Sequence, residues 1–201
     1  MIRVACVDIS SVDESLYRSL YEKASLQRRQ RADRYLRQED KLRCVTAEAL
    51  LKAMLGVDDD QTVKNAFGKP YIRGRQDVYY NLSHSGRYVV LAWGDTEVGV
   101  DVQRHDSVTD MEAVGIHCFT PDERLYIQQD ANRFYEIWTK KESFLKYTGK
   151  GFCAGPTSFS VLKPEGKIRY FYCMLSNAYS LSLCTEDAEW KTELLNAYRL
   201  L

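Results

Sequence analysis

Two stretches of the sequence resemble each other at a separation of 94 residues. Glu48 opens the run EALLK, and Glu142 opens the similar run ESFLK. A related separation of 91 residues relates Tyr88, which opens the apolar run YVVL, to Tyr179. Repeated segments indicate a duplicated fold, and binding sites often lie between two such halves. The repeat predicts an α+β fold with pseudo-twofold duplication, in which two α/β halves each pack a long helix on a small antiparallel sheet.

The two halves are expected to be residues 1–100 and 101–201, with a site at the seam between them. Apolar periodicity and turn residues predict the helices and strands of each half. The expected helices are residues 13–23, one or two within 27–55, one that begins at Thr120-Pro121, and 132–147. The expected strands are residues 2–9, 78–82, 88–93, 98–102, 167–175 and 179–184. Turn residues between the strands from 78 to 102 predict an antiparallel meander, and the last two strands resemble a hairpin. The C-terminal tail receives no assignment.

Charge and composition exclude several classes of protein. The 201 residues carry 28 basic and 28 acidic side chains, which argues against a nucleic-acid or membrane-surface binder held by bulk charge. The six cysteines are scattered singly, without the paired spacing of a metal site or the density of a disulfide scaffold. The N-terminal stretch has neither a signal-peptide hydrophobic region nor a transmembrane-length run. We therefore expect a soluble, cytoplasmic protein.

The run EVGVDVQ, from Glu97 to Gln103, alternates polar and apolar residues as a half-buried strand does. Asp101 would share one face of this strand with Gly99 and Gln103. An aspartate at the end of a strand is usually a turn or capping residue. Its function therefore depends on which side chains lie near it in space.

A second run places Trp138, Glu142 and Lys146 on one helical face. A glutamate four residues before a lysine is commonly an exposed ion pair worth about 0.2–0.5 kcal/mol. A tryptophan on the same face favours a partly buried polar site instead. If Glu142 and Asp101 meet in space, their carboxylates could hold magnesium, which takes few protein ligands and keeps positions for water and phosphate oxygens.

Three further segments carry polar or basic side chains. His84, in the run NLSHS, could donate to a phosphate, act as a general base or belong to a simple turn. In the run FGKPY, glycine and proline fix a turn that presents Lys69, although most such lysines are only solvated. A basic stretch contains Arg28, Arg29, Arg31, Arg34 and Arg37. Interleaved acidic residues are typical of a mixed-charge helical face, whereas converging arginines suit a phosphate.

In their order and spacing, these segments resemble the 4'-phosphopantetheinyl transferase superfamily, specifically its larger monomeric group of the surfactin-synthetase-activating type. That family has Gly-Val/Ile-Asp followed, after a spacer, by Trp-x-x-Lys-Glu-Ser/Ala-x-x-x-Lys. Here Gly99-Val100-Asp101 is followed by the run from Trp138 to Lys146 at the expected separation. The family's Gly-Lys-Pro turn and Asn-x-Ser-His-Ser motif correspond to residues 68–70 and 81–85. The four matches cover about residues 28–151 in the family's order.

The resemblance implies an enzyme that transfers the 4'-phosphopantetheine arm of coenzyme A to a serine of an acyl or peptidyl carrier protein, releasing 3',5'-ADP. Coenzyme A would bind between the halves of a monomer, and the expected cofactor is Mg²⁺, which Mn²⁺ could replace. The implied metal ligands are Asp101, Glu142 and Gln103. The implied catalytic residues are Glu142, near the serine hydroxyl, and Lys146, near the reacting phosphate. The implied coenzyme A-binding residues are Arg28, Arg31, Lys69, Pro70, Ser83, His84, Lys141 and Lys146.

One residue departs from the family pattern. Many members have a glutamate two residues after the aspartate, where this chain has Gln103. A neutral amide can offer a carbonyl oxygen or orient a bound water, but the site loses one negative charge, so weaker magnesium binding is expected. Two rival functions stay open. One is a catalytically impaired homologue that binds coenzyme A or a carrier protein, and the other is a metal-assisted nucleotide pyrophosphatase that uses water as its nucleophile.

Overall fold

A computed structural model describes residues 1–106, 110–151 and 155–200. The helices are α1 (Glu14–Lys23), α2 (Leu26–Asp33), α3 (Gln38–Leu55), α4 (Met111–Cys118), α5 (Pro121–Ile127) and α6 (Ala131–Thr148). The strands are β1 (Ile2–Asp8), β2 (Thr62–Lys64), β3 (Pro70–Ile72), β4 (Tyr79–Ser85), β5 (Tyr88–Gly94), β6 (Val98–Arg104), β7 (Arg169–Ser176), β8 (Tyr179–Thr185) and β9 (Trp190–Leu195). The predicted α+β class is confirmed.

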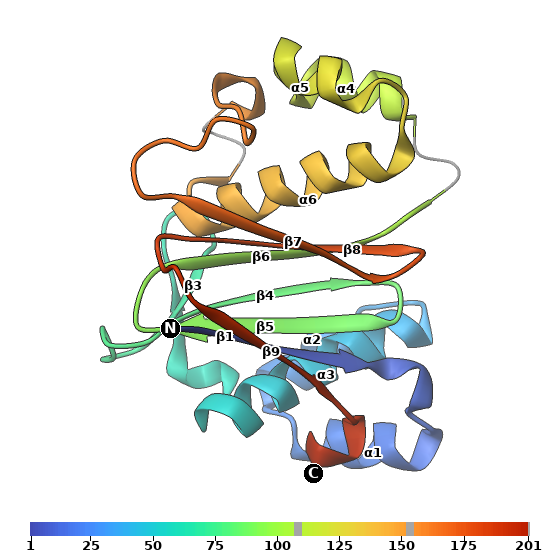
Figure 1. The fold of residues 1–201 in the computed structure, drawn as a ribbon. Helices are drawn as coiled ribbons and strands as arrows, with labels where there is room; N and C mark the ends of the chain where they lie inside the picture. The colour runs from blue at the N-terminus through green and yellow to red at the C-terminus, as the bar shows by residue number, and fades with distance from the viewer. Residues whose placement is uncertain (107–109, 152–154, 201) are drawn as a thin grey trace.

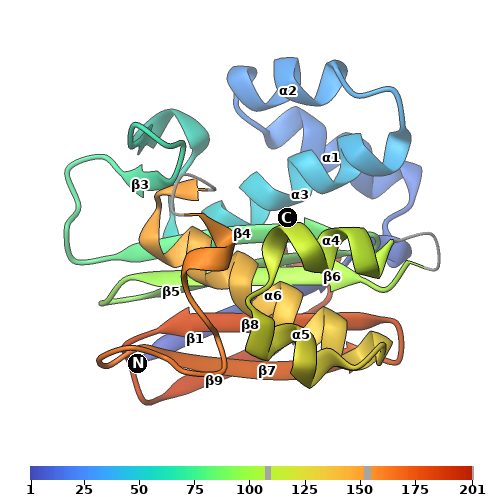
Figure 2. The ribbon, with the colours of Figure 1, turned by 90° about the horizontal axis from the view of Figure 1, so that it is seen from above.

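The elements form four layers (Figure 1). From top to bottom in that view lie helices α4–α6, the sheet β6-β8-β7, the sheet β4-β5-β1-β9 and helices α1–α3. Seen from above, α6 runs over the sheet β6-β8-β7 (Figure 2), and it contacts β6 and β8 more extensively than β7. The small β2-β3 ladder lies apart from both sheets. Each long helix therefore covers the outer face of its own sheet.

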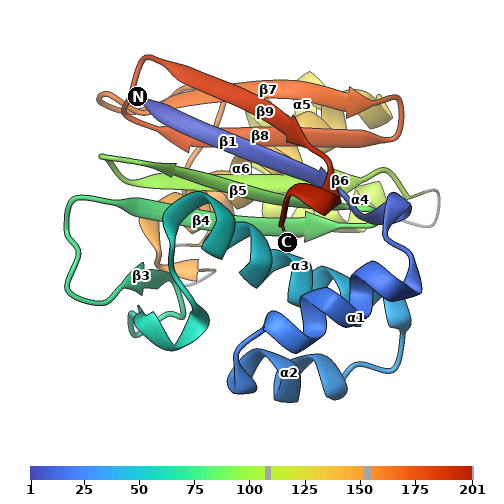
Figure 3. The same cartoon turned by 90° about the horizontal axis from the view of Figure 1, so that it is seen from below.

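The pairing of the strands differs from the prediction in two respects. β4 and β5 form the expected antiparallel hairpin, but β6 pairs with β8, so the predicted meander through β6 is wrong. The short turn after β5 carries the chain from one sheet to the other, where the apolar residues of β6 face the core between the sheets. β9, in the unassigned tail, runs parallel to β1 (Figure 3), which makes the first sheet mixed rather than antiparallel.

Local sequence explains where the main helices begin and end. Thr120 and Glu123 form the predicted capping box at the start of α5, with Pro121 in the first turn. Gly56 and Gly149 end α3 and α6 with φ angles of 66° and 62°. Glycine adopts this left-handed conformation without the steric cost of a Cβ. Both long helices thus stop where the sequence predicts.

Three hydrophobic cores hold the layers together. β1 contributes to two of them by its alternation: Ala5 and Val7 pack toward α1–α3, whereas Val4 and Cys6 belong to the core between the sheets. A third core, rich in aromatic residues, joins α4 and α5 to α6. The apolar periodicity seen in the sequence therefore corresponds to real buried faces.

The repeated segments occupy similar places in the two halves. EALLK lies on α3, which packs against β5, and ESFLK lies on α6, which packs against β6 and β8. Tyr88 of β5 and Tyr179 of β8 meet in an edge-to-face contact, with ring centroids 4.8 Å apart. A division of the chain at residue 100 stays a proposal, because β9 from the second half completes the sheet of the first.

Gly99 controls how closely α6 approaches β6. A Cβ at this position would fall well inside van der Waals distance of the backbone of Ser143 and Tyr147 on α6. Backbone atoms of a packed helix cannot move away as a flexible side chain can. The absence of a side chain at Gly99 therefore brings the polar residues of α6 close to Asp101.

Gly99→Ala is expected to lower the free energy of unfolding by about 1–3 kcal/mol, because the added methyl group overpacks the contact between strand and helix. Urea denaturation would measure the change. Gly115→Ala is the matched control, since its Cβ on α4 would lie 3.7 Å from the nearest atom, a ring carbon of Phe119. Equal stability of the Gly99 variant and the native protein would contradict this account of the contact.

Within the described ranges, no helix combines the length and apolar character needed to cross a membrane. Five cysteines are free thiols: Cys6, Cys44, Cys118, Cys173 and Cys184. The sixth, Cys153, lies outside the described residues.

Candidate active site

Asp101 lies at the seam of the two sheets, where β6 passes beside β4 and under α6. It is 5% exposed, and its Oδ1 accepts hydrogen bonds from Lys146 Nζ at 2.6 Å and Ser83 Oγ at 2.9 Å. Its Oδ2 is buried without a hydrogen-bond partner among the described residues. Buried polar atoms are almost always paired, so this carboxylate oxygen indicates a position that a bound group would complete.

Glu142 projects from α6 one turn before Lys146, as the helical spacing predicts. None of the described residues forms a hydrogen bond or an ion pair with Glu142. Burial and the nearby negative charge of Asp101 raise the pKa of Glu142, whereas the positive charge of Lys146 opposes this shift. Asp101 and Glu142 thus lie on the strand and the helix that meet at Gly99. Glu48, its counterpart in the repeat, accepts backbone hydrogen bonds from Ser25 and Asp59, so the first copy of this glutamate is structural.

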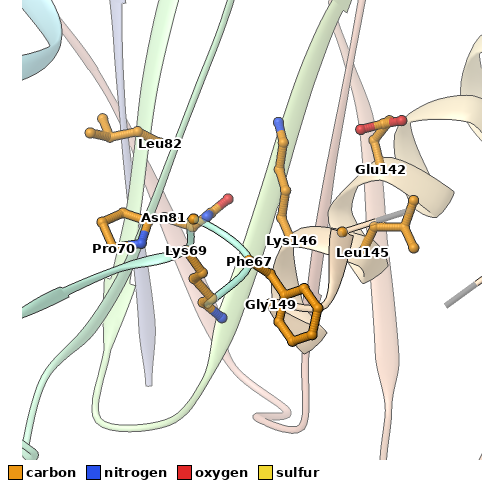
Figure 4. A pocket seen from close by; sticks show the side chains of 11 residues that line it. Phe67, Lys69, Pro70, Asn81, Leu82, Glu142, Leu145, Lys146 and Gly149 are labelled. Atoms are coloured by element: carbon orange, nitrogen blue, oxygen red, sulfur yellow. The ribbon is translucent and has the colours of Figure 1, made fainter. Parts of the chain in front are cut away.

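A pocket of about 210 Å³ opens beside these groups (Figure 4). Glu142 and Lys146 line it from α6, and Pro70 and Leu82 line the opposite side. A second pocket, of about 840 Å³, shares Gly68, Pro70 and Leu82 with the first. The two pockets therefore adjoin and form one groove that extends from α6 to α2.

The second pocket has a basic rim. Its lining includes Arg31, Arg34, Lys64 and His84. Desolvation lowers the pKa of His84, and the positive charges of Arg43, Lys146 and Arg31 lower it further. Several cations around a neutral imidazole create a positive potential that suits a phosphate group. The groove thus has Glu142 and Lys146 at one end, with Asp101 bound to Lys146 beside it, and a basic rim at the other end.

Lys69 lines the first pocket, and its ammonium also has partners within the protein. Its side chain is buried, and its ammonium forms an ion pair with Glu97. The same ammonium donates to the carbonyls of Tyr147 at 2.7 Å and Val98 at 3.4 Å. Lys69 thereby satisfies a carbonyl in the last turn of α6 and ties that helix to the start of β6. Its assignment to coenzyme A stays a prediction.

Lys141 has a similar set of partners within the protein. It pairs with Glu123 at 2.9 Å, with 2% and 0% of the two side chains exposed. Its ammonium also donates to the carbonyls of Pro156 and Phe159, at 2.7 and 2.8 Å. These contacts use its three protons and join α6 to α5 and to the segment that follows α6. The assignment of Lys141 to coenzyme A stays a prediction.

Arg28 and Arg31 lie on the same helix but differ in exposure. The Arg28 side chain is buried, forms an ion pair with Asp59 and donates to the carbonyl of Cys44 at 3.3 Å. It links α2 to α3 and to the turn after α3. Arg31 is exposed, and both arginines line the second pocket. The Nε of Arg28 is buried without a hydrogen-bond partner among the described residues, so both assignments to coenzyme A stay predictions.

Gln103 follows Asp101 on the same face of β6, but its amide has another partner. Its Nε2 donates to the carbonyl of Arg104 at 3.2 Å, and the residue lines a small polar pocket together with Arg37 and Arg43. That pocket contains neither Glu142 nor Asp101. The assignment of Gln103 as a metal ligand stays a prediction.

The donor set fits a divalent cation that needs few protein ligands. No group of three or more histidine, cysteine, aspartate and glutamate side chains suitable for a metal occurs in the described ranges. Asp101 and Glu142 supply carboxylate oxygens, and Oδ2 of Asp101 lacks a partner. Mg²⁺ is usually held by one or two carboxylates together with water and substrate phosphates. These residues therefore fit Mg²⁺ or Mn²⁺ with a phosphorylated ligand.

Several residues that support the site were missed from the sequence. Asn65 donates to the carbonyl of Gly149 at 2.9 Å, and Glu97 holds Lys69, so both fix the end of α6. Neither has a local signal. Glu123 was found as a helix cap, but its second partner, Lys141, depends on the tertiary fold. Arg43, which contributes positive charge near His84, was not selected from its mixed-charge helix.

A carboxylate and a lysine in one groove, a buried aspartate bound to that lysine and a basic rim are features of an enzyme that acts on a phosphorylated substrate. Comparisons with known proteins agree with this class. A family model described as the 4'-phosphopantetheinyl transferase superfamily matches residues 97–199. A 4'-phosphopantetheinyl transferase of Bacillus subtilis is 31% identical over 156 residues, which cover 72% of this chain and 69% of that protein.

Two other relatives match over more of the chain. The 4'-phosphopantetheinyl transferase gsp of Aneurinibacillus migulanus is 29% identical over 82% of this chain and 73% of its own length. The 4'-phosphopantetheinyl transferase psf-1 of Bacillus pumilus is 28% identical over 100% of this chain and 97% of its own length. The chain therefore belongs to the 4'-phosphopantetheinyl transferase superfamily. The predicted family and transferase class are confirmed.

Proposed function

We propose that this transferase moves 4'-phosphopantetheine from coenzyme A to a serine of an acyl or peptidyl carrier protein, with Mg²⁺ held by Asp101 and Glu142. The observation that supports the proposal is that Lys146, which lines the groove with Glu142, binds the buried carboxylate of Asp101, whose Oδ2 has no hydrogen-bond partner among the described residues. We further propose that it acts as a cytoplasmic monomer, as in the group that its motifs resemble.

The reaction forms a bond between the serine oxygen and the phosphorus that carries pantetheine. The bond from that phosphorus to the bridging oxygen breaks, and 3',5'-ADP leaves. Mg²⁺, when bound, would neutralise charge on the pyrophosphate oxygens. Lys146 adds a positive charge at the same end of the groove. Glu142, whose pKa is raised, would accept the proton that the serine hydroxyl loses.

The groove also suits the rest of coenzyme A. Arg31 and His84 line the pocket that adjoins the carboxylates, and positive charges surround His84. A phosphate bound there would lie away from the reacting bond, so it would contribute to affinity and orientation. We assign this basic rim to the 3'-phosphate end of coenzyme A.

The proposal is tested by incubating the protein with coenzyme A, Mg²⁺ and several purified carrier proteins, followed by mass spectrometry of the carriers. We expect one carrier to gain the phosphopantetheine group and an equal amount of 3',5'-ADP to appear. Consumption of coenzyme A without a carrier would favour the pyrophosphatase alternative. Binding of coenzyme A without release of 3',5'-ADP would favour the impaired homologue.

Arg31→Ala is expected to raise KM for coenzyme A by about 10–150-fold with little change in kcat, because a charge-assisted contact to a non-reacting phosphate is worth about 1.5–3 kcal/mol. Steady-state kinetics would measure both constants. Dephospho-coenzyme A, which lacks the 3'-phosphate, is the control, and the variant and native proteins should use it equally well. An equal rise in KM with both substrates would contradict the assignment of the basic rim.

A further inference from the structure

Side chains of β4 join the two sheets at the seam. β4 and β6 belong to different sheets and share no ladder of backbone hydrogen bonds. Instead, alternate side chains of β4 accept hydrogen bonds from alternate backbone N–H groups of β6. The pairs are Asn81 Oδ1 with Val100 N at 2.9 Å, Ser83 Oγ with Val102 N at 3.2 Å and Ser85 Oγ with Arg104 N at 3.0 Å. These bonds fix the position of β6, and therefore of Asp101, relative to β4.

Ser83 differs from the other two residues because its hydroxyl also contacts the candidate active site. The hydroxyl donates to Asp101 Oδ1 at 2.9 Å and accepts from Lys146 Nζ at 3.0 Å. A serine hydroxyl has one proton and two lone pairs. The hydroxyl donates its proton to Asp101, and its two lone pairs accept hydrogen bonds from Val102 N and Lys146 Nζ. The Ser83 hydroxyl therefore has no hydrogen-bonding capacity left for coenzyme A.

This arrangement controls which oxygen of Asp101 is available. Ser83 and Lys146 both bind Oδ1, while Oδ2 is buried and unpaired within the described structure. Two donors on one oxygen restrict rotation of the carboxylate. We infer that Ser83 is a positioning residue that fixes Asp101 so that Oδ2 receives the divalent cation. The inference rests on the proposed function, and it replaces the predicted role of Ser83 as a ligand of coenzyme A.

The test compares Ser83→Ala with Ser85→Ala. Each variant loses one side-chain acceptor for a β6 amide, but Ser83 alone of these two serines touches Asp101. Removal of a residue that orients a metal ligand typically weakens metal binding by about 10–100-fold. We expect a loss of this size in Mn²⁺ affinity for Ser83→Ala, measured by isothermal titration calorimetry without carrier protein, and no change for Ser85→Ala. Ser83→Thr, which keeps the hydroxyl, should retain most of the affinity.

The outcomes separate this inference from the proposed function. Native Mn²⁺ affinity in Ser83→Ala, with a raised KM for coenzyme A at saturating Mg²⁺, would overturn the positioning role and restore the predicted ligand role. An equal loss of affinity in both alanine variants would assign the effect to the seam as a whole and overturn the inference for Ser83. Absence of Mn²⁺ binding by the native protein would also overturn it. If Mn²⁺ binding depends on Ser83 but the native protein transfers no phosphopantetheine, then the proposed function is wrong and this inference still holds.

Discussion

Replacing Glu142 by glutamine is expected to lower kcat for phosphopantetheine transfer by at least about 100-fold, the usual contribution of a general base. Glutamine keeps the size of the side chain but removes the negative charge that would bind the cation and accept the serine proton. Because no hydrogen bond or ion pair to the described residues is lost, the free energy of unfolding should stay within about 0.5 kcal/mol of the native value. Single-turnover transfer and circular dichroism would measure the two effects.

Glu136→Gln provides the matched control for this variant. Glu136 lies on the same helix, where it pairs with Lys140 at 2.6 Å, away from the groove. Its replacement should leave transfer unchanged. A Glu142→Gln protein that transfers at a near-native rate in saturating Mg²⁺ would show that the paired carboxylates are not the reaction centre. Similar losses in both variants would point to a general effect of charge on α6.

Lys141→Met is expected to lower the free energy of unfolding by about 3–5 kcal/mol, since the Glu123 carboxylate would lose its buried countercharge. Burial lowers the pKa of Lys141 and the charge of Glu123 opposes that shift, as expected for a desolvated pair. The variant also loses the hydrogen bonds to the carbonyls of Pro156 and Phe159. Urea denaturation at neutral pH would measure the loss.

Lys140→Met is the control, because the neighbouring lysine forms a more exposed pair that is worth about 0–1 kcal/mol. The double variant Lys141→Met, Glu123→Leu removes both charges and should recover part of the stability. If Lys141→Met unfolds like the native protein but has a raised KM for coenzyme A, then Lys141 is a ligand as first predicted. That result would also mean that its ammonium leaves Glu123 when coenzyme A binds.

The grouping of Asp101, Glu142 and Lys146 was predictable from the sequence because it depends on short-range periodicity. Alternation along β6 puts Asp101 on the same face as Gly99, and helical spacing puts Glu142 beside Lys146. The small residue at 99 allows the two faces to meet. The structure adds their orientation, including the unpaired Oδ2, which depends on Ser83 from another sheet.

The roles of the lysines could not be predicted in the same way. Lys69 and Lys141 lie in motifs beside the site, and a lysine side chain is long enough to reach either the groove or the interior. Distant residues decide between these positions: Glu97 and the end of α6 hold Lys69, and Glu123 holds Lys141. No local pattern in the sequence connects these partners.

Strand pairing showed a similar limit. The turns after β4 and β5 look alike in sequence, yet the first forms a hairpin and the second carries the chain into another sheet. Turn residues indicate that the chain reverses its direction, but they do not indicate which strand the next strand pairs with. β9 was missed because its partner β1 lies at the opposite end of the sequence and its own residues are mostly exposed.

The pairing of β9 with β1 determines when the first sheet can be completed during synthesis. Residues 190–195 lie beside residues 2–7 in parallel register, so the sheet that contains the first strand lacks an edge strand until the chain has been made to residue 195. During synthesis, β1 and the β4-β5 hairpin leave the ribosome early, while their last neighbour is still untranslated. Closure of the first sheet therefore has to wait for β9, which is made long after the strand β1 that it joins.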